Sequence, residues 1–198
     1  MSVDTLSRAA CRHQLRQARR ALSPEQQKQA AIGLARHLPD HTLVQHAQSV
    51  ALYIANDGEL DPHLLAEVLH TRGKRLALPV LHPFHSQHLL FLEFQPGQPM
   101  RTNRYGIPEP DLDKTRVVPM AELDLILLPL VGFDNAGNRM GMGGGFYDRT
   151  LGCLDMGARP QLIGLAHECQ RVDQLPVAPW DVPMDAIATA EGLIDLAG

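Results

Sequence analysis

A glycine-rich segment is the part of the sequence best suited to hold a charged ligand. Four of the five residues from 141 to 145 are glycine, and Phe146, Tyr147 and Asp148 follow directly. Glycine tolerates positive φ and lets a ligand approach the main chain, so successive N–H groups of such a loop can converge on an anion. The segment therefore predicts a phosphate-binding loop, in preference to a glycine-rich surface turn.

The well-known nucleotide-binding motifs do not match this loop. The dinucleotide pattern G-x-G-x-x-G fails because Phe146 stands where its last glycine should be, and no Gly-Lys-Ser/Thr completes a Walker pattern. The loop does follow the apolar run 125–131, which is typical of a strand buried on both faces, and a helix is expected to begin near Phe146. This order of strand, tight turn, loop and helix favours anion binding, to which the helix N-terminus would contribute.

A basic stripe runs along the first expected helix, residues 4–21. Its arginines recur at helical spacing, at Arg8, Arg12, Arg16, Arg19 and Arg20. Three interpretations are open: a solvated surface, a contact with RNA or DNA, and a face that turns inward onto the triphosphate of a nucleotide. On the residues alone, the solvated surface ranks first.

Two further groups of polar residues are candidate ligand sites. Glu59 follows the apolar run 49–54, although a lone carboxylate in such a loop is usually solvated. His82, His85 and His88 invite a metal site, but the proline that follows the first of them breaks the helical face that such a site would need. We therefore expect surface histidines there.

Strands and helices alternate along the chain and must position these residues. Strands are expected at 49–54, 74–80, 89–94, 125–131, 161–167 and 186–190, and helices at 4–21, 23–38, 61–72 and 146–154. This alternation predicts an α/β fold of Rossmann-like type, with a mainly parallel sheet flanked by helices on both faces, in a single domain over residues 1–198. Ligands of such sheets gather beyond the carboxyl ends of the strands, where Glu59 falls. The Pro-rich connector 96–113 is long enough to cover a site.

The composition argues against several classes of protein. Eighteen basic and twenty-two acidic side chains give a formal charge of −4, which argues against nucleic acid as a partner. Cys11, Cys153 and Cys169 are odd in number and far apart, so neither a disulfide framework nor a thiolate zinc site is expected. No apolar run approaches the roughly 20 residues that span a bilayer. We expect a soluble, cytoplasmic protein without a membrane partner.

The glycine loop and two other segments carry a family resemblance. Residues 138–148 read N-R-M-G-M-G-G-G-F-Y-D, which resembles the signature of the 5-formyltetrahydrofolate cyclo-ligase family in its bacterial form. The Pro-Trp-Asp-x-Pro stretch at 179–183 is similar to the C-terminal segment of that family, and Arg8 and Arg12 resemble its Lys/Arg pair at the ATP site. The similarity covers nearly the whole chain, and it implies a fold like those of sugar-phosphate isomerases and CoA transferases.

The resemblance implies an enzyme that uses ATP and Mg²⁺ to convert 5-formyltetrahydrofolate, with or without a polyglutamate tail, to 5,10-methenyltetrahydrofolate. ADP and phosphate would be released by way of an N5-iminium phosphate, and the enzyme would be a monomer. Because no protein group needs to become covalently attached, alignment and neutralisation of phosphoryl charge would supply the catalysis. A folate- or nucleotide-binding regulator without turnover, or an RNA-binding module built on the basic helix, would be the alternatives.

The resemblance also implies a role for individual residues. The ATP contacts are Arg8, Arg12, Arg139, Gly141, Met142, Gly143, Gly144, Gly145, Phe146 and Tyr147. The folate contacts are Ile54, Glu59, Tyr105, Met142 and Phe146, the catalytic residues are Arg139 and Tyr147, and the ligands of Mg²⁺ are Asp148 and Asp181. For Tyr105 and Tyr147, structural packing is an open alternative.

The loop departs from many relatives at two positions. Met142 and Gly144 are uncharged, whereas those relatives have basic residues there. Charge compensation of a bound triphosphate would then move to Arg139, to the N-terminal arginines and to the metal.

Overall fold

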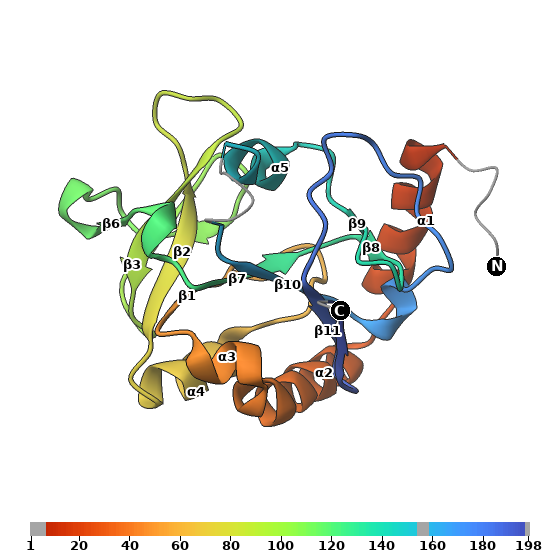
Figure 1. Ribbon diagram of the computed structural model, residues 1–198, viewed down its shortest axis with the longest axis horizontal. Coiled ribbons are helices and arrows are strands. Elements are labelled where there is room, and N and C mark those ends of the chain that lie inside the picture. The colour runs from red at the N-terminus through yellow and green to blue at the C-terminus, as the bar shows by residue number, and fades with distance from the viewer. Residues whose placement is uncertain (1–6, 154–158, 197–198) are drawn as a thin grey trace.

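An eight-stranded sheet forms the centre of the protein, in a computed structural model that describes residues 7–153 and 159–196 (Figure 1). The strand order is β12-β11-β10-β7-β1-β2-β3-β6. The bounds are β1 Ser49–Ala51, β2 Arg75–Leu81, β3 Leu89–Phe94, β6 Val117–Val118, β7 Leu125–Pro129, β10 Gln161–Leu165, β11 Ala186–Ala188 and β12 Leu193–Asp195. Strands β2, β1, β7, β10 and β11 are mutually parallel, and β3, β6 and β12 extend the two edges in antiparallel fashion. The predicted α/β domain with a mainly parallel sheet is confirmed.

Helices cover both faces of this sheet, as predicted. Figure 1 shows α2 (Pro24–His37), α3 (Thr42–His46) and α4 (His63–Thr71) on one face and α5 (Phe146–Leu151) on the other. The central strands are therefore buried on both faces, and Leu125 to Leu128 of β7 have almost no exposed surface. Burial on both faces explains why this strand reads as a continuous apolar run in the sequence.

The first helix, α1 (Arg8–Arg20), lies to one side of the sheet. Its Cys11 and Leu15 pack against Val131 and Met140, next to a short hairpin of β8 (Gly132–Phe133) and β9 (Arg139–Met140). Ser7 caps this helix by accepting a hydrogen bond from the N–H of Ala10. The packing turns the arginine-bearing side of α1 towards the carboxyl ends of the central strands.

Local signals placed the ends of two helices correctly. Ser23 and Gln26 form the reciprocal capping box that begins α2. Gly73, with a φ of +77°, lies just beyond α4 and lets the chain leave the helix in a left-handed conformation. The short helices η1 (Leu38–Asp40), η2 (Lys114–Arg116), η3 (Met120–Glu122) and η4 (Glu168–Gln170) complete the connections.

The boundaries differ from the sequence predictions where the chain turns towards the pocket described below. The strands expected to reach residues 54 and 131 end at Ala51 and Pro129. Tyr53, Ile54 and Leu130 then line the pocket, and the N–H of Val131 donates to the carbonyl of Met140 outside the main sheet. The strand expected at 186–190 ends at Ala188, and β12 follows it. The predicted ends of two helices, residues 4–6 and 154, lie outside the described residues.

Two short antiparallel pairs were not predicted. The hairpin β8–β9 replaces the simple turn expected before the glycine loop, and β4 (Arg101–Thr102) pairs with β5 (Pro108–Glu109) inside the long connector. Strands of two residues are too short to leave a hydrophobic pattern. Within the described part of the chain, no helix combines the length and the apolar character that a membrane crossing requires.

Candidate active site

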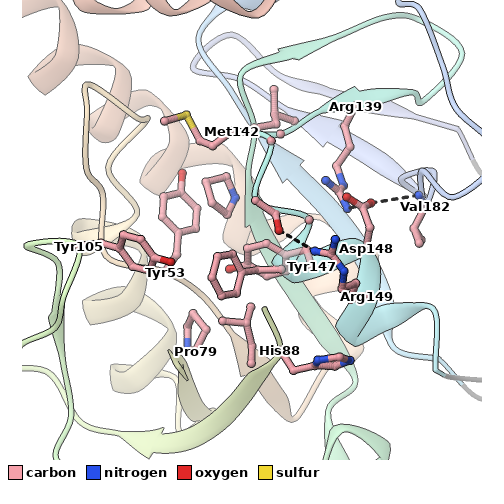
Figure 2. A pocket seen from close by; sticks show the side chains of 18 of the residues that line it. Tyr53, Pro79, His88, Tyr105, Arg139, Met142, Tyr147, Asp148, Arg149 and Val182 are labelled. Atoms are coloured by element: carbon pink, nitrogen blue, oxygen red, sulfur yellow. Dashed lines mark hydrogen bonds and ion pairs between the residues drawn. The ribbon is translucent and has the colours of Figure 1, made fainter. Parts of the chain in front are cut away.

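A cavity of about 1360 Å³ opens beyond the carboxyl ends of β1 and β7 (Figure 2). It is lined by every residue that the sequence nominated for a ligand site on the basis of the family resemblance. These residues are Arg8, Arg12, Ile54, Glu59, Tyr105, Arg139, Gly141, Met142, Gly143, Gly144, Gly145, Phe146, Tyr147, Asp148 and Asp181. Their segments are far apart in the sequence, so the fold gathers them in one place.

The glycine loop needs glycine at two of its positions for conformational reasons. Gly143 and Gly145 have φ values of +96° and +67°, which residues with a Cβ rarely adopt. Arg12 of α1 donates from Nε to the carbonyl of Gly141 at 2.8 Å, and Arg149 of α5 donates from Nη1 to the carbonyl of Gly144 at 2.7 Å. With these carbonyls held by arginines, the loop has a defined shape before any ligand binds.

Arg139 and Asp148 form an ion pair on one side of the cavity. Arg139 Nη2 donates to Asp148 Oδ1 at 2.5 Å, and the N–H of Val182 donates to the same oxygen at 3.3 Å (Figure 2). Arg139 is almost fully buried, and its Nε has no hydrogen-bond partner within the described part of the chain. A buried donor without a partner is costly, so an anion or a water molecule at this position would be stabilised.

Asp181 is held in a similar way by the first helix. Arg8 donates to both of its carboxylate oxygens, at 2.6 Å and 3.0 Å, and the N–H of Ala178 donates at 2.8 Å. Burial raises the pKa of Asp181, but the hydrogen bonds from Arg8 and Ala178 outweigh it, so the pKa lies below its usual value. The carboxylate is therefore ionised at neutral pH.

The two aspartates fit one kind of magnesium site. Among the described residues there is no cluster of three or more His, Cys, Asp or Glu side chains that could hold a metal by themselves. Asp148 and Asp181 do face the same cavity, and a Mg²⁺ ion that binds with a nucleotide needs only one or two carboxylates besides phosphates and water. The donor set suits an ion that arrives with phosphate and does not suit an all-protein cage.

Glu59 lines the cavity and belongs to a largely buried polar cluster. Its Oε1 is 3.8 Å from Nη1 of the fully buried Arg19, and its Oε2 accepts a hydrogen bond from the N–H of Asn56 at 3.1 Å. Burial raises the pKa of Glu59 to about 7, although the charge of Arg19 opposes the shift. The carboxyl group can therefore change its protonation state near neutral pH.

Three tyrosines line the cavity. Figure 2 shows Tyr53 and Tyr105 across the pocket from Arg139 and Asp148, with Tyr147 between them. Burial and then the charge of Glu59 raise the pKa of Tyr147, so its hydroxyl stays protonated and can only donate or accept hydrogen bonds at neutral pH. The half-exposed Tyr105 meets Phe146 edge-to-face, with ring centroids 5.9 Å apart. It therefore packs against a loop residue and is also open to a ligand.

The basic stripe of α1 is divided between two tasks. Arg8 and Arg12 face the cavity, whereas Arg16, Arg19 and Arg20 all bind the carboxylate of Asp57. The solvated surface, which ranked first on the residues alone, is therefore wrong for Arg19, because this side chain has no exposed surface. One carboxylate offsets only one of these three positive charges, and the side chain of Arg20 is 56% exposed, so this part of the helix keeps accessible positive charge.

The three histidines form a small cluster at the tip of the β2–β3 hairpin. The rings of His82 and His85 are 4.6 Å apart, and those of His85 and His88 are 6.1 Å apart. Nδ1 of His82 accepts hydrogen bonds from the N–H groups of Phe84 and His85, so this atom stabilises the turn. His88 alone also lines the cavity.

Several residues of the cavity were not predicted. Tyr53, Trp180 and Arg149 line it, and all three neighbour residues that the sequence did nominate. Arg149 could have been found from its spacing in the sequence. It follows Gly145 by four residues, and residues four apart lie on one face of a helix.

Comparisons with known proteins now give this geometry a context. The family model described as "5-formyltetrahydrofolate cyclo-ligase family" matches residues 4–190. This chain belongs to the 5-formyltetrahydrofolate cyclo-ligase family. The 5-formyltetrahydrofolate cyclo-ligase of Escherichia coli K12 is 47% identical over 175 residues, which are 88% of this chain and 96% of the relative. The corresponding protein of Haemophilus influenzae is 43% identical, over 92% of this chain and 97% of its own length.

Solved structures agree with the family membership. The NMR structure of Aquifex aeolicus 5,10-methenyltetrahydrofolate synthetase matches with a TM-score of 0.82 at 26% sequence identity, covering 98% of this chain and 94% of that one. The similar synthetase of Mycoplasma pneumoniae matches with a TM-score of 0.74 at 26% identity, over 94% of this chain and 100% of that one. The family relationship thus extends over the whole sheet and the segments that line the cavity.

Proposed function

We propose that this protein closes 5-formyltetrahydrofolate to 5,10-methenyltetrahydrofolate at the expense of ATP, with release of ADP and phosphate. The observation that supports this function is the convergence of all the family-implied residues on one cavity. Figure 2 shows Arg139, Asp148 and Arg149 on one side of that cavity and Tyr53 and Tyr105 on the other. The nucleotide phosphates would occupy the first side and the pterin the second.

The reaction requires that a formamide oxygen become a leaving group. This oxygen attacks the γ-phosphorus of ATP and ADP departs, which leaves an N5-iminium phosphate. N10 then adds to the iminium carbon and loses its proton, and the C–O bond breaks to release phosphate as the methenyl bridge forms. Each step builds or moves negative charge on phosphate oxygens, which fixed positive groups can stabilise.

The residues of the chain would divide this work by position. The N–H groups of Gly141 to Gly145 would bind phosphate oxygens, and Arg8, Arg12 and Arg139 would offset their charge. Tyr147 would donate a hydrogen bond from its protonated hydroxyl. A Mg²⁺ ion held by Asp148 and Asp181 would supply additional neutralisation of phosphate charge.

Nucleotide binding would then exchange partners within the site. The carboxylates of Asp148 and Asp181 form ion pairs with Arg139 and Arg8. If these carboxylates held Mg²⁺, the guanidinium groups of Arg139 and Arg8 would be available to the phosphates. Because each charge keeps an opposite partner throughout, the exchange avoids leaving a buried charge unpaired.

Turnover can be measured by the absorbance of methenyltetrahydrofolate after the protein is mixed with Mg²⁺-ATP and 5-formyltetrahydrofolate. We expect Asp148→Asn to lower kcat/KM by about 100-fold or more, because it removes a charged ligand and partner at the phosphate. Asparagine keeps the size of the side chain, whereas alanine would leave the buried Arg139 without its partner. Urea unfolding of the variant controls for stability.

Two results would count against this function. Unchanged turnover of a folded Asp148→Asn variant would remove the residue from the mechanism. Binding of folate and nucleotide by the wild-type protein, without ADP release that depends on 5-formyltetrahydrofolate, would instead favour a non-catalytic regulator.

A further inference from the structure

Arg149 is a pocket residue with no assigned role. It stands on α5, and its side chain turns back over the first turn of that helix to the glycine loop (Figure 2). Its Nη1 donates to the carbonyl of Gly144 at 2.7 Å. A Cβ added at Gly145 would lie only 2.5 Å from this nitrogen, so the guanidinium rests directly against the main chain of the loop.

Arg12 makes the corresponding contact from a different element. Its Nε donates to the carbonyl of Gly141 at 2.8 Å, and a Cβ added at Gly143 would lie 3.5 Å from its guanidinium carbon. The loop is therefore held between a guanidinium from α1 at its beginning and a guanidinium from α5 at its end.

The two guanidinium groups differ from their neighbours in how their charge is compensated. Arg8 and Arg139 form ion pairs with Asp181 and Asp148. Over residues 7–153 and 159–196, no carboxylate forms an ion pair with Arg12 or Arg149. A guanidinium has several N–H donors, and the loop carbonyl uses only one of them on each side. Among these described residues, each end of the loop thus carries a guanidinium group without a carboxylate partner and with N–H donors that no described residue uses.

The end of the loop held by Arg149 runs directly into a proposed folate contact. Gly144 and Gly145 precede Phe146, whose ring packs edge-to-face on Tyr105. In a phosphoryl transfer to folate, the terminal phosphate of the nucleotide must lie nearest to the folate. A guanidinium at this end is therefore placed for the terminal phosphate.

We propose that Arg149 binds the terminal phosphate of ATP and stays in contact with the phosphoryl group while it passes to the formyl oxygen. This inference rests on the proposed function. A planar guanidinium can contact two phosphate oxygens at once, and a charge already held in position stabilises the spreading negative charge without reorganisation. Arg149 thereby supplies the positive charge that the uncharged Met142 and Gly144 do not bring to the loop.

The test compares Arg149→Gln and Arg149→Lys with a matched control, Arg36→Gln. Arg36 is an exposed residue in the last turn of α2, which covers the opposite face of the sheet. Calorimetry with Mg²⁺ gives the dissociation constants of ADP and of a non-hydrolysable ATP analogue, and the absorbance assay gives kcat and both KM values.

We expect Arg149→Gln to weaken the ATP analogue about 10-fold or more beyond its effect on ADP, because one charge-assisted contact is lost only at the terminal phosphate. The variant should also have a lower kcat, with the KM for folate changed by less than about twofold. Arg149→Lys should fall between wild type and Arg149→Gln, since the charge remains but the two-oxygen contact is lost. Arg36→Gln should match the wild type.

Other outcomes would overturn the proposal. If Arg149 only holds the loop in shape, Arg149→Gln weakens ADP and the ATP analogue equally. If Arg149→Gln does not fold, the same comparison is made with Arg149→Lys, and equal weakening again refutes the terminal-phosphate contact. A wild-type protein that neither binds nucleotide nor turns over would refute the proposed function itself, whereas normal wild-type turnover with unaffected Arg149 variants refutes only this inference.

Discussion

Glu59 shows how a single side chain can be tuned by its surroundings. The groups that face it are Arg19, the N–H of Asn56, Asp57, Tyr53 and Tyr147. Burial dominates over the attraction of Arg19 and raises the pKa to about 7. A carboxylate accepts hydrogen bonds from the N–H donors of a pterin, whereas the neutral acid also presents an O–H donor.

We therefore expect the KM for 5-formyltetrahydrofolate to rise as the pH falls through about 7, the pKa of Glu59 in the folded protein. Glu59→Gln should weaken folate binding more than ATP binding and should remove this pH dependence. Steady-state kinetics between about pH 6 and about pH 8.5 would measure both effects. An unchanged pH profile in the variant would show that another group titrates.

The same pKa shift predicts an effect on stability. Between the ordinary pKa of 4.5 and the folded value of about 7, the folded protein keeps a proton that the unfolded chain has lost. Stability from this group is therefore complete below the ordinary pKa and decreases as the pH rises through the folded one. Relative to the wild type, Glu59→Gln should gain unfolding free energy at about pH 8 compared with about pH 5, as urea titrations can show.

At the scale of single residues, the sequence nominated residues that the fold brings to one cavity, but it did not predict their pairings. Glycine, arginine and aspartate at these spacings indicate phosphate chemistry by type, and the family resemblance assigned them individually. Whether Asp181 meets Arg8, or Asp148 meets Arg139, depends on tertiary folding, which local spacing does not encode. Arg149 escaped notice because its contact is made through the main chain of the loop.

At the scale of elements, the strands and helices were predictable, whereas the ends of several strands were not. A continuous apolar run located β7, and the Ser23 capping signal located the start of α2. The predicted strands extended beyond the observed carboxyl ends of β1 and β7, because apolar residues continue past the sheet into the cavity and the core around α1. The β8–β9 hairpin depends on hydrogen bonds from Ala136 and Asn138 to Asp134, which no period reveals.

The packing of β10 gives a prediction at this scale. A Cβ at Gly164 would lie 2.6 Å from Leu130 Cδ2 and 2.8 Å from Ile187 Cδ1. We expect Gly164→Ala to lower the free energy of unfolding by about 1–3 kcal/mol, because the core is overpacked there. Gly192→Ala is the matched control, since a Cβ there meets nothing within 4 Å. Equal urea midpoints for the two variants would contradict the packing argument.

At the scale of the whole molecule, one carboxylate joins the first helix to the rest of the fold. Asp57 has a left-handed φ of +55° and binds three arginines of α1. Burial raises its pKa, but the hydrogen bonds from Arg16, Arg20 and Arg19 outweigh it and lower the pKa to about 2. The attachment is therefore intact at all physiological pH values, and it fixes the helix that carries Arg8 and Arg12.

We expect Asp57→Asn to lower the free energy of unfolding by about 3 kcal/mol or more, because the buried Arg19 loses its charged partner. Asparagine tolerates the left-handed conformation, so backbone strain does not confound the result. Asp40→Asn, which breaks an exposed pair with Arg72, should cost about 1 kcal/mol or less. The KM for ATP should also rise in Asp57→Asn, whereas an unchanged value would mean that α1 is positioned without this contact.

The ion pair between Arg8 and Asp181 has a consequence for biosynthesis, because its partners are 173 positions apart. At ribosomal rates of about 5–20 residues per second, on the order of ten to thirty seconds separate their synthesis. A nascent chain can fold α1 early, but it cannot complete the proposed nucleotide site until the segment before β11 has left the exit tunnel. Ribosome-stalled chains that end before this segment should therefore not be retained on immobilised ATP, and the enzyme should acquire its activity only after this segment has emerged.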